Sequence, residues 1–342
     1  MRRFLTILVL AILASAGPAL AGPLVPDDQY YPYEWYGSVL GLPEAWGISL
    51  GSSSVTVAVL DTGVISTTPD LLGRVKSPLA APGLPILNGM ANRHGTWVAS
   101  VAAMRVNNII GGAGVGNFSI LPITVADANG ATSPSYIANG IRMAANAGAR
   151  AINVSYLTDD YQPLDEAAAY ARSKGALTFV AAGNSNDLNP MSGYDNLIFV
   201  SGTNAKDLRW DNGVGKLGST WGPFVDLSAP ADDIVVADPT FESGYGWGDG
   251  TSFAAPLAAG AAALVWSINP SLTPDEVQNI LYTTADDLGP LGWDEVYGWG
   301  RLDIGAAAER AYEMTLTPEP GTLLLLAAGL AAPLARRLRR RP

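Results

Sequence analysis

A long run of small apolar residues, 253–268, constrains the fold of this chain more than any other stretch. It is rich in alanine, leucine and valine, and it follows glycines at positions 244, 246, 248 and 250. Small side chains let a helix approach its neighbours closely, so the run predicts a buried helix. The glycines predict a loop that turns sharply before that helix. Ser252 would then lie at the helix N-terminus, where free N–H groups favour negative charge, as a nucleophile or as a simple helix cap.

Apolar strands alternate with helices along most of the chain. Strands are predicted at residues 55–60, 119–125, 151–155, 177–182, 197–202 and 224–227. Helices are predicted at residues 94–104, 136–147 and 164–173 and, after a Thr-Pro-Asp-Glu capping box, up to residue 285. This order predicts an α/β fold with three αβα layers, in which a mostly parallel central sheet is covered on both faces. Asp61 and Asn184 follow predicted strands, at the sheet edge where such folds place their active sites.

The two ends of the chain are typical of transport signals. Residues 1–21 combine two early arginines, an apolar stretch and Ala-Leu-Ala, which predicts a secretory signal peptide. Residues 317–342 contain Pro-Glu-Pro, a short apolar span and five arginines. A helix needs roughly 20 apolar residues to cross a bilayer, and the apolar span of this tail is shorter. We therefore expect a transient membrane contact; a permanent tail anchor is the alternative. The tail resembles the PEP-CTERM sorting signal, which implies export machinery and an exosortase as partners and a secreted or cell-envelope location.

The body between these ends, residues 22–316, predicts one large domain. It retains 13 of the 20 Lys and Arg and 30 of the 31 Asp and Glu residues, a formal charge of −17. We expect no binding to nucleic acid or anionic lipid from so acidic a surface. The chain has no cysteine, so neither a disulfide nor thiol chemistry is available to it.

The chain contains a single histidine, His94. Without cysteine, one histidine cannot build the common zinc sites. Serine hydrolysis needs an alcohol, a base and a carboxylate that orients the base, and Ser252, His94 and Asp61 supply these groups. The α/β-hydrolase order, with histidine last, is excluded by the position of His94. An aspartic protease would need a second carboxylate beside the Asp-Thr-Gly of Asp61, and no second such motif is present.

Three segments of the chain resemble the three catalytic motifs of the subtilases, the subtilisin-like serine proteases, and in particular those of the thermitase-like members. These segments are residues 57–64, 94–96 and 250–256. Residues 181–184 resemble the segment that binds the oxyanion in this family. The resemblance implies a serine endopeptidase acting on proteins or peptides. It also implies four catalytic roles: Asp61 orients the base, His94 is the base, Ser252 attacks, and Asn184 stabilises the oxyanion.

The resemblance further implies a substrate-binding site made of Ser155, Tyr156, Leu157 and Gly183. Only the serine of Ser155-Tyr156-Leu157 matches the family's Ser-Leu-Gly segment. Leu157 stands where glycine leaves room for the bound residue, so we predict a narrowed primary pocket that prefers small residues; a shifted loop is the alternative. Other departures from the family pattern occur at Thr68, Trp97 and Phe253, and none removes a catalytic group.

Asp28, Asp70 and Asn108 fall where thermitase-like subtilases place oxygen ligands around a structural calcium. Calcium prefers several carboxylate, amide and carbonyl oxygens, so the resemblance implies a calcium site; three solvated loop residues are the alternative. The stretch from residue 22 to Asp61 resembles a mature N-terminus, and we expect no folding pro-domain. Two other functions stay open: a pseudoprotease used for adhesion, and a processing protease with few substrates.

Overall fold

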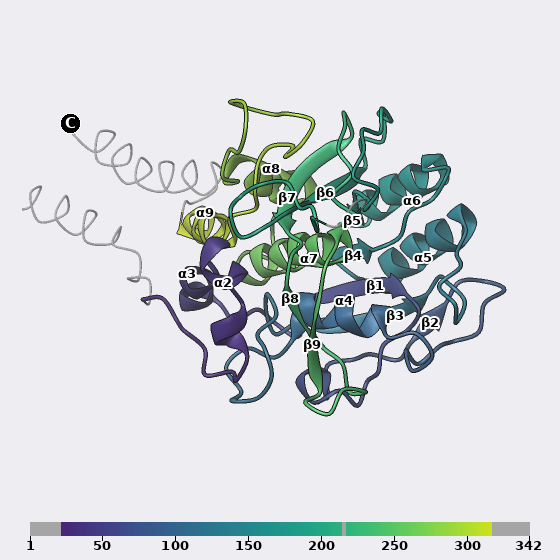
Figure 1. Cartoon of the computed structure of the whole chain (residues 1–342), viewed down its shortest axis with the longest axis horizontal. Coiled ribbons are helices and arrows are strands. Elements are labelled where there is room, and N and C mark those ends of the chain that lie inside the picture. Colours follow the sequence, from purple (N-terminus) through teal and green to yellow (C-terminus); the bar gives the residue numbers. More distant parts are fainter. Residues whose placement is uncertain (1–21, 214–216, 317–342) are drawn as a thin grey trace, which may run out of the picture.

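The computed structural model describes residues 22–213 and 217–316, so the predicted signal peptide and sorting signal lie outside the described residues. A parallel sheet of seven strands, in the order β2-β3-β1-β4-β5-β6-β7, forms its centre (Figure 1). The strands are β1 (Thr56–Asp61), β2 (Leu79–Ala80), β3 (Ser119–Thr124), β4 (Ala151–Val154), β5 (Leu177–Ala181), β6 (Leu197–Thr203) and β7 (Val225–Pro230). Their continuous apolar sequences fit strands that are covered on both faces.

Successive residues of β1 show how the two faces are covered. Val57 and Val59 belong to one buried cluster, while Ala58 and Leu60 belong to another. The first cluster includes α4 (His94–Ala103), α7 (Thr251–Ile268), α8 (Pro274–Thr283) and α9 (Ile304–Leu316). The second includes α5 (Pro134–Asn146) and α6 (Gln162–Ser173), which lie side by side in Figure 1. The predicted three-layer αβα fold is therefore confirmed.

Helix α7 is the buried helix that the sequence predicts. Among the described residues it is the one helix long and apolar enough to cross a membrane, but 83% of it is buried inside the protein. Its small residues are needed for close packing, because a Cβ built on Gly260 would lie 2.7 Å from Val115. The helix starts at Thr251 with Gly250 as the N-cap residue. Ser252 lies in the first turn, and the alternative that it caps the helix is wrong.

The glycine-rich segment before α7 differs from its prediction as a loop. Tyr245–Gly248 forms strand β9, which pairs antiparallel with β8 (Ile234–Ala237). A Cβ on Gly246 would lie 2.4 Å from the Phe241 ring, and one on Gly248 would lie 2.4 Å from the Phe253 ring. Close packing against two aromatic rings, rather than a sharp turn, accounts for these glycines.

Short helices that the sequence did not predict occupy the N-terminal part of the body. They are the 3₁₀ helix η1 (Tyr31–Tyr33) and the α-helices α2 (Tyr36–Val39) and α3 (Leu42–Ile48). A further 3₁₀ helix, η2 (Pro69–Leu71), follows β1. The predicted capping box is present at α8, where Thr273 and Glu276 bond each other's backbone N–H groups.

Candidate active site

Asp61 and His94 form an oriented pair at the carboxyl end of the sheet. Asp61 is the last residue of β1 and is fully buried. Its Oδ2 lies 2.9 Å from His94 Nδ1, and its Oδ1 accepts bonds from the Thr62 N–H at 2.8 Å and the Thr62 hydroxyl at 3.1 Å. A carboxylate can only accept, so Nδ1 carries the proton of this bond. The other ring nitrogen, Nε2, is thereby left as an acceptor, the state that a general base requires.

The pKa of His94 follows from two opposing effects. Burial of the ring would lower the pKa, but the charge of Asp61 and the hydrogen bond to it outweigh burial and raise it. We therefore expect His94 in an inactive Ser252→Ala chain to titrate above the usual value of about 6.5, and catalysis to fall as the pH drops through that pKa. When Asp61→Asn is combined with Ser252→Ala, the carboxylate charge that raises the pKa of His94 is lost, so this pKa should fall below the usual value.

NMR provides a direct measurement of this pKa, because the chain has one histidine and gives one imidazole titration curve. An Asp165→Asn chain is the matched control, since Asp165 bonds Asn196 away from this pair. A His94 pKa that is the same with and without the Asp61 charge would contradict the prediction.

Ser252 is held through its backbone carbonyl. The Ser155 hydroxyl donates to the Ser252 carbonyl oxygen at 2.9 Å and accepts from the Asn153 side chain at 2.9 Å. The ring of the next residue, Phe253, has its centroid 6.5 Å from that of His94. Within residues 22–213 and 217–316 no hydrogen bond joins the Ser252 hydroxyl to His94. Such bonds are often long in substrate-free enzymes and tighten when substrate binds.

The Asn184 amide is oriented by the residue that precedes Ser252. Its Oδ1 accepts from the Thr251 N–H and the Thr251 hydroxyl, both at 2.9 Å. The Thr251 hydroxyl in turn accepts from the Gly183 N–H at 3.0 Å. With its oxygen occupied in this way, the amide turns its NH₂ group away from Thr251, where it is free to donate. Gly183 needs to be glycine, because its φ is 109° and a Cβ would lie 2.8 Å from the Thr220 hydroxyl.

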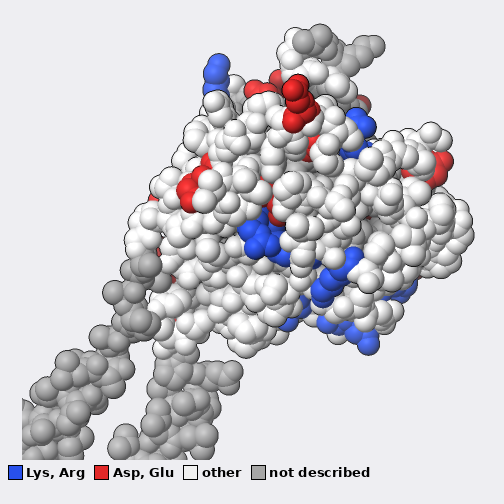
Figure 2. Space-filling view, turned by 90° about the horizontal axis from the view of Figure 1, so that it is seen from below, with Lys and Arg blue, Asp and Glu red and all other residues white. Residues whose placement is uncertain are grey.

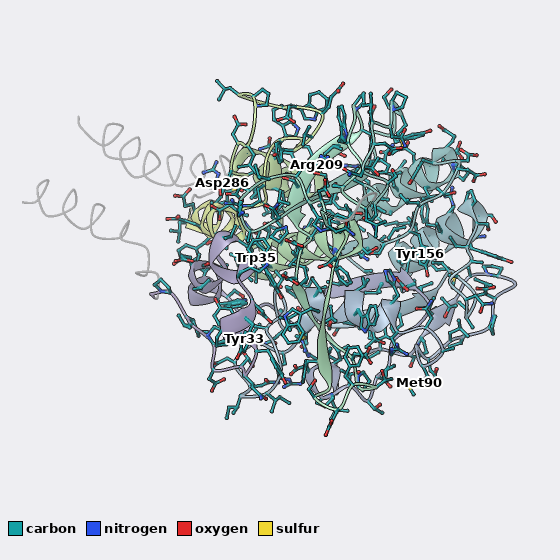
Figure 3. All side chains as sticks on the ribbon, in the orientation of Figure 1. Tyr33, Trp35, Met90, Tyr156, Arg209 and Asp286 are labelled. Atoms are coloured by element: carbon teal, nitrogen blue, oxygen red, sulfur yellow. The ribbon has the colours of Figure 1, made fainter. Side chains whose placement is uncertain are left out.

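The segment Ser155–Leu157 lies beside the pair formed by Asp61 and His94. The Tyr156 ring (labelled in Figure 3) meets the His94 ring edge to face, with 6.0 Å between centroids. Leu157 is 51% exposed, and its Cδ2 lies 3.1 Å from the position of a Cβ on Gly183. The Leu157 side chain thus extends across to Gly183, so it lies between the two segments that we predict to form the pocket walls.

The three predicted metal ligands also lie together. Asp28 accepts from the N–H groups of Asn107 and Asn108 at 2.7 and 2.9 Å, and the Asn108 side chain donates to Asp70 at 2.8 Å. Burial raises the pKa of Asp28, and it raises that of Asp70 to about 6. Within the described ranges, no three acidic or histidine side chains are arranged as a metal-binding group.

Glu34, a buried acid close to this loop, was not predicted from the sequence. Its Oε1 accepts from the Ala113 N–H at 2.9 Å, while its Oε2 is buried without a hydrogen-bond partner. Burial raises the pKa of Glu34 well above its usual range, and the charges of Asp28 and Asp70 raise it further. The residues that hold the catalytic groups, Thr62, Asn153 and Thr251, were missed as well; their only signal is their place next to predicted site residues.

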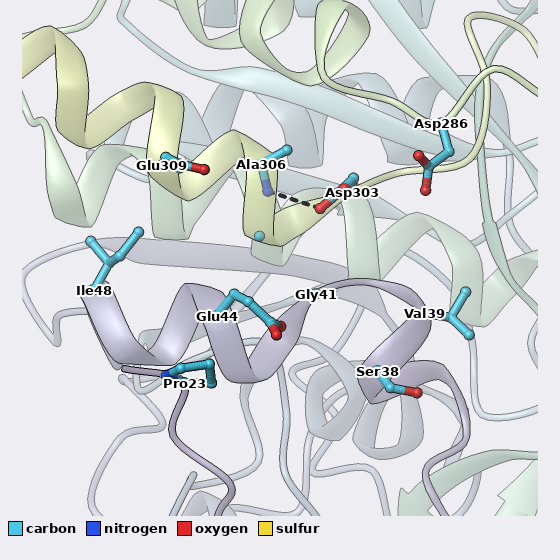
Figure 4. A pocket seen from close by; sticks show the side chains of 11 residues that line it. Pro23, Ser38, Val39, Gly41, Glu44, Ile48, Asp286, Asp303, Ala306 and Glu309 are labelled. Carbon is cyan, nitrogen blue, oxygen red and sulfur yellow. Dashed lines mark hydrogen bonds between the residues drawn. The ribbon is translucent and has the colours of Figure 1, made fainter. Parts of the chain in front are cut away.

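A separate cavity of about 570 Å³ lies between α3 and α9 (Figure 4). Its lining includes the acids Glu44, Asp286, Asp303 and Glu309 and none of the predicted catalytic residues. Asp303 accepts from the Ala306 N–H at 2.8 Å and so stabilises the first turn of α9. The cavity therefore plays no part in the site at the sheet edge.

A carboxylate that orients a histidine, beside a serine in the first turn of a buried helix, has the character of a serine hydrolase. Comparison with known proteins identifies the family: the chain belongs to the subtilases, whose family model matches residues 52–300. It is a subtilisin-like serine endopeptidase. The PEP-CTERM protein-sorting motif matches residues 316–341, and the protein is secreted or located at the cell surface.

Individual relatives agree with this assignment. Thermitase of Thermoactinomyces vulgaris is 35% identical over 78% of this chain and 94% of its own length. Subtilisin Savinase of Lederbergia lenta is 36% identical over 80% of this chain and 97% of its own. A solved protease structure from Pseudoalteromonas arctica, 27% identical, superposes with a TM-score of 0.67 and covers 84% of this chain and 99% of its own. The predicted family and fold are both confirmed.

Proposed function

We propose that this protein is an exported endopeptidase that cleaves peptide bonds through an acyl-enzyme formed on Ser252. The observation that carries the proposal is the 2.9 Å bond between His94 Nδ1 and Asp61 Oδ2. With Nδ1 held in this way, Nε2 takes the proton of the Ser252 hydroxyl as its oxygen attacks the carbonyl carbon. His94 then returns the proton to the leaving amine, and water releases the acyl group by the same steps.

The oxyanion formed in each step needs donors already in place. Asn184 supplies one through its side-chain NH₂ group, which the bonds to Thr251 direct away from that residue. The N-terminus of α7, where Ser252 lies, adds the positive end of the helix dipole. The charge that develops on the carbonyl oxygen is thus stabilised without any rearrangement of the site.

Labelling with a fluorophosphonate tests the proposal, because this reagent bonds covalently to activated serines. We expect the purified body to be labelled and Ser252→Ala and His94→Ala to remain unlabelled. Ser267→Ala is the matched control, since Ser267 is in the same helix but donates to the Ala263 carbonyl. Absence of label on the unmutated protein would favour the pseudoprotease. A labelled protein that cleaves only a few envelope proteins would favour the processing protease.

The chain divides into three parts: a signal peptide (1–21), a peptidase domain (22–316) and a sorting signal (317–342). The first and last of these parts support export of the protein. The match of the sorting motif to residues 316–341 supports a role for an exosortase and a transient membrane contact of the tail. Mass spectrometry of the mature protein should find neither residues 1–21 nor the arginine cluster. An intact C-terminus on cell-associated protein would contradict removal of the tail.

The position of Leu157 supports a narrowed primary pocket. Its branched end reaches Gly183 on the facing segment, where Cδ2 lies 3.1 Å from the position of a Cβ, and so it occupies space that a large substrate side chain would need. We expect the parent to prefer small residues before the scissile bond. Leu157→Gly should raise kcat/KM for substrates with larger residues at this position by about tenfold or more, where tenfold is the lower end of the range for such pocket changes. Cleavage of a peptide library measures both preferences.

Leu291→Gly is the control for this comparison, because Leu291 is 97% exposed. A parent enzyme that already favours Phe, Leu or Tyr before the cut, with no broadening in Leu157→Gly, would show that the pocket is open.

Three buried acids support a calcium ion at the 107–112 loop. Burial and then the charges of Asp28 and Asp70 raise the pKa of Glu34, and burial and then the charge of Asp28 raise the pKa of Asp70. Glu34 Oε2 is buried and lacks a hydrogen-bond partner. Asp28 and Asp70 would hold the ion through side-chain oxygens. Asn108 would join them once its amide turns over, because its NH₂ group donates to Asp70 and its oxygen accepts from the Ile110 N–H. A cation there offsets the repulsion between the acids, and it stabilises the fold because it binds only the native state.

Removal of calcium with excess chelator should lower the Tm of the Ser252→Ala body by at least about 5 °C. The Asp70→Asn variant should unfold at a lower temperature and lose most of its response to the chelator. Asp275→Asn, which changes an exposed acid on α8, should respond like the parent. A Tm that is unchanged by the chelator would refute the calcium site.

A further inference from the structure

Arg93 places a fixed cation next to the catalytic base. It directly precedes His94 at the N-terminus of α4. Its Nε donates to Asp238 Oδ2 at 2.9 Å, and Trp97 Nε1 donates to the same oxygen at 2.8 Å. The guanidinium carbon also lies 5.9 Å from the centroid of the Trp97 ring. Arg93 is therefore held from two sides, by a carboxylate and by an aromatic face.

Asp238 is an anchor that cannot move toward solvent. The residue is fully buried just after β8, and its other oxygen accepts from the Thr240 N–H at 2.9 Å and the Thr240 hydroxyl at 2.6 Å. Its carboxylate thus binds Arg93 through Nε alone. The two terminal NH₂ groups of Arg93 have no partner anywhere in the described ranges 22–213 and 217–316, and the side chain is 35% exposed.

The position of Arg93 relative to the cleft follows from the elements around His94. Tyr156, in the segment that would pair with the acyl half of the substrate, lies against one part of the His94 ring. Phe253 lies near another part and also contacts Gly248 of β9. The leaving half of the peptide, which continues past Ser252, would therefore run over the β8–β9 hairpin. Arg93 is joined to this hairpin through Asp238.

Other charges near this half of the cleft do not cancel the guanidinium. Asp249, the acid closest to Ser252 in the chain, turns its Oδ1 to the Asp233 N–H at 2.8 Å. On the face seen in Figure 2, Lys and Arg side chains gather near the centre and toward the lower right, although the body as a whole has 13 basic and 30 acidic residues. Arg93 thus offers a partly exposed guanidinium with two unbonded NH₂ groups, and its geometry suits a carboxylate.

We propose that Arg93 selects substrates that carry an aspartate or glutamate among the first three residues after the scissile bond. The proposal rests on the proposed function, because the carboxylate reaches Arg93 only when the peptide lies across Ser252. Together with the narrowed pocket, it defines a substrate class: a small residue before the cut and an acidic residue soon after it. Charge-based selection of this kind favours one substrate over another without a change in the chemical step.

The test uses quenched fluorescent peptides that differ only in having Glu, Gln or Lys at each of these three positions. At one of them we expect kcat/KM to be about fivefold higher for Glu than for Gln, the size of a partly exposed ion pair, and lowest for Lys. Arg93→Gln should bring the Glu-to-Gln ratio close to one, and Arg93→Lys should keep part of it. Arg142→Gln, which removes a cation that lies over the Tyr170 ring instead, should keep the full ratio.

Ionic strength gives a second measurement that needs no variant. The Glu preference of the unmutated enzyme should shrink between about 0.02 and 0.5 M salt, because salt screens an exposed pair. The proposal is overturned by a Glu-to-Gln ratio of kcat/KM near one at all three positions, or by a ratio that survives both Arg93→Gln and high salt. In either case the proposed function stands as long as the enzyme cleaves the peptides. Failure to cleave any peptide, together with failure to react with a fluorophosphonate, overturns the proposed function itself.

Discussion

Replacement of His94 by alanine is expected to lower kcat on the order of a million-fold, the loss known for removal of the catalytic histidine in subtilisin. Without the imidazole, no group within reach takes the proton of Ser252, since the chain has no second histidine. The Ser252→Ala variant should lose about as much. The double variant should lose no more than either single one, because the two residues act as one unit.

Asp61→Asn keeps the shape of the site and is the matched variant for this measurement. It should cost on the order of ten-thousand-fold, because the amide no longer selects the required tautomer of His94. Single-turnover kinetics on one peptide substrate, with circular dichroism to verify folding, measure all four variants. A loss below about a hundredfold in His94→Ala would mean that another group acts as the base, since general bases contribute at least that much.

Replacement of Asn184 by leucine, which has a similar shape, should lower kcat about a hundred- to thousand-fold, the loss measured for this donor in subtilisin. KM should change little, because the amide bonds the oxyanion more strongly than the ground-state carbonyl. The leucine also loses the bonds that Thr251 donates to the Asn184 oxygen, so the Tm of the variant needs to be measured beside its kinetics.

Thr251→Val separates these two effects. It removes the hydroxyl bond to Asn184 and the bond that the same hydroxyl accepts from the Gly183 N–H, but it leaves the backbone bond and the amide in place. We expect a loss of kcat of about fivefold to tenfold, the size of one to two hydrogen bonds. Equal losses in the two variants would show that Asn184 serves only to hold Thr251. A rise in KM with unchanged kcat in Asn184→Leu would place the residue in substrate binding.

The repeated pattern of apolar strands and helices made the sheet predictable from the sequence. Strands such as β1 and β5 are covered on both faces, so their apolar character is continuous and their ends are clear. The β8–β9 hairpin was missed because Tyr245–Gly248 alternates with glycine, which favours a loop in isolation. Its strand conformation depends on Phe241 and Phe253, whose rings fill the space beside Gly246 and Gly248, and such long-range packing leaves no local signal.

The candidate site also contains some residues that have a local sequence signal and others that come together only on folding. Asp61, His94, Asn184 and Ser252 each lie in a short segment that resembles a family motif, so the sequence is sufficient to predict a role for each of them. The pairing of Arg93 with Asp238 joins residues 145 positions apart, and neither residue belongs to a motif. Glu34 likewise meets the 107–112 loop only after folding, through its bond to Ala113, 79 residues away.

The burial of α7 has a consequence for how this enzyme can change over evolution or in the laboratory. The helix that carries Ser252 is covered along most of its length, so few substitutions there will leave a folded protein. Leu157 and Arg93, which we propose to contact the substrate at the rim of the cleft, have exposed fractions of 51% and 35%. Substitutions at such exposed positions cost little stability. New substrate preferences should therefore arise through the rim, and libraries for altered specificity are best confined to it.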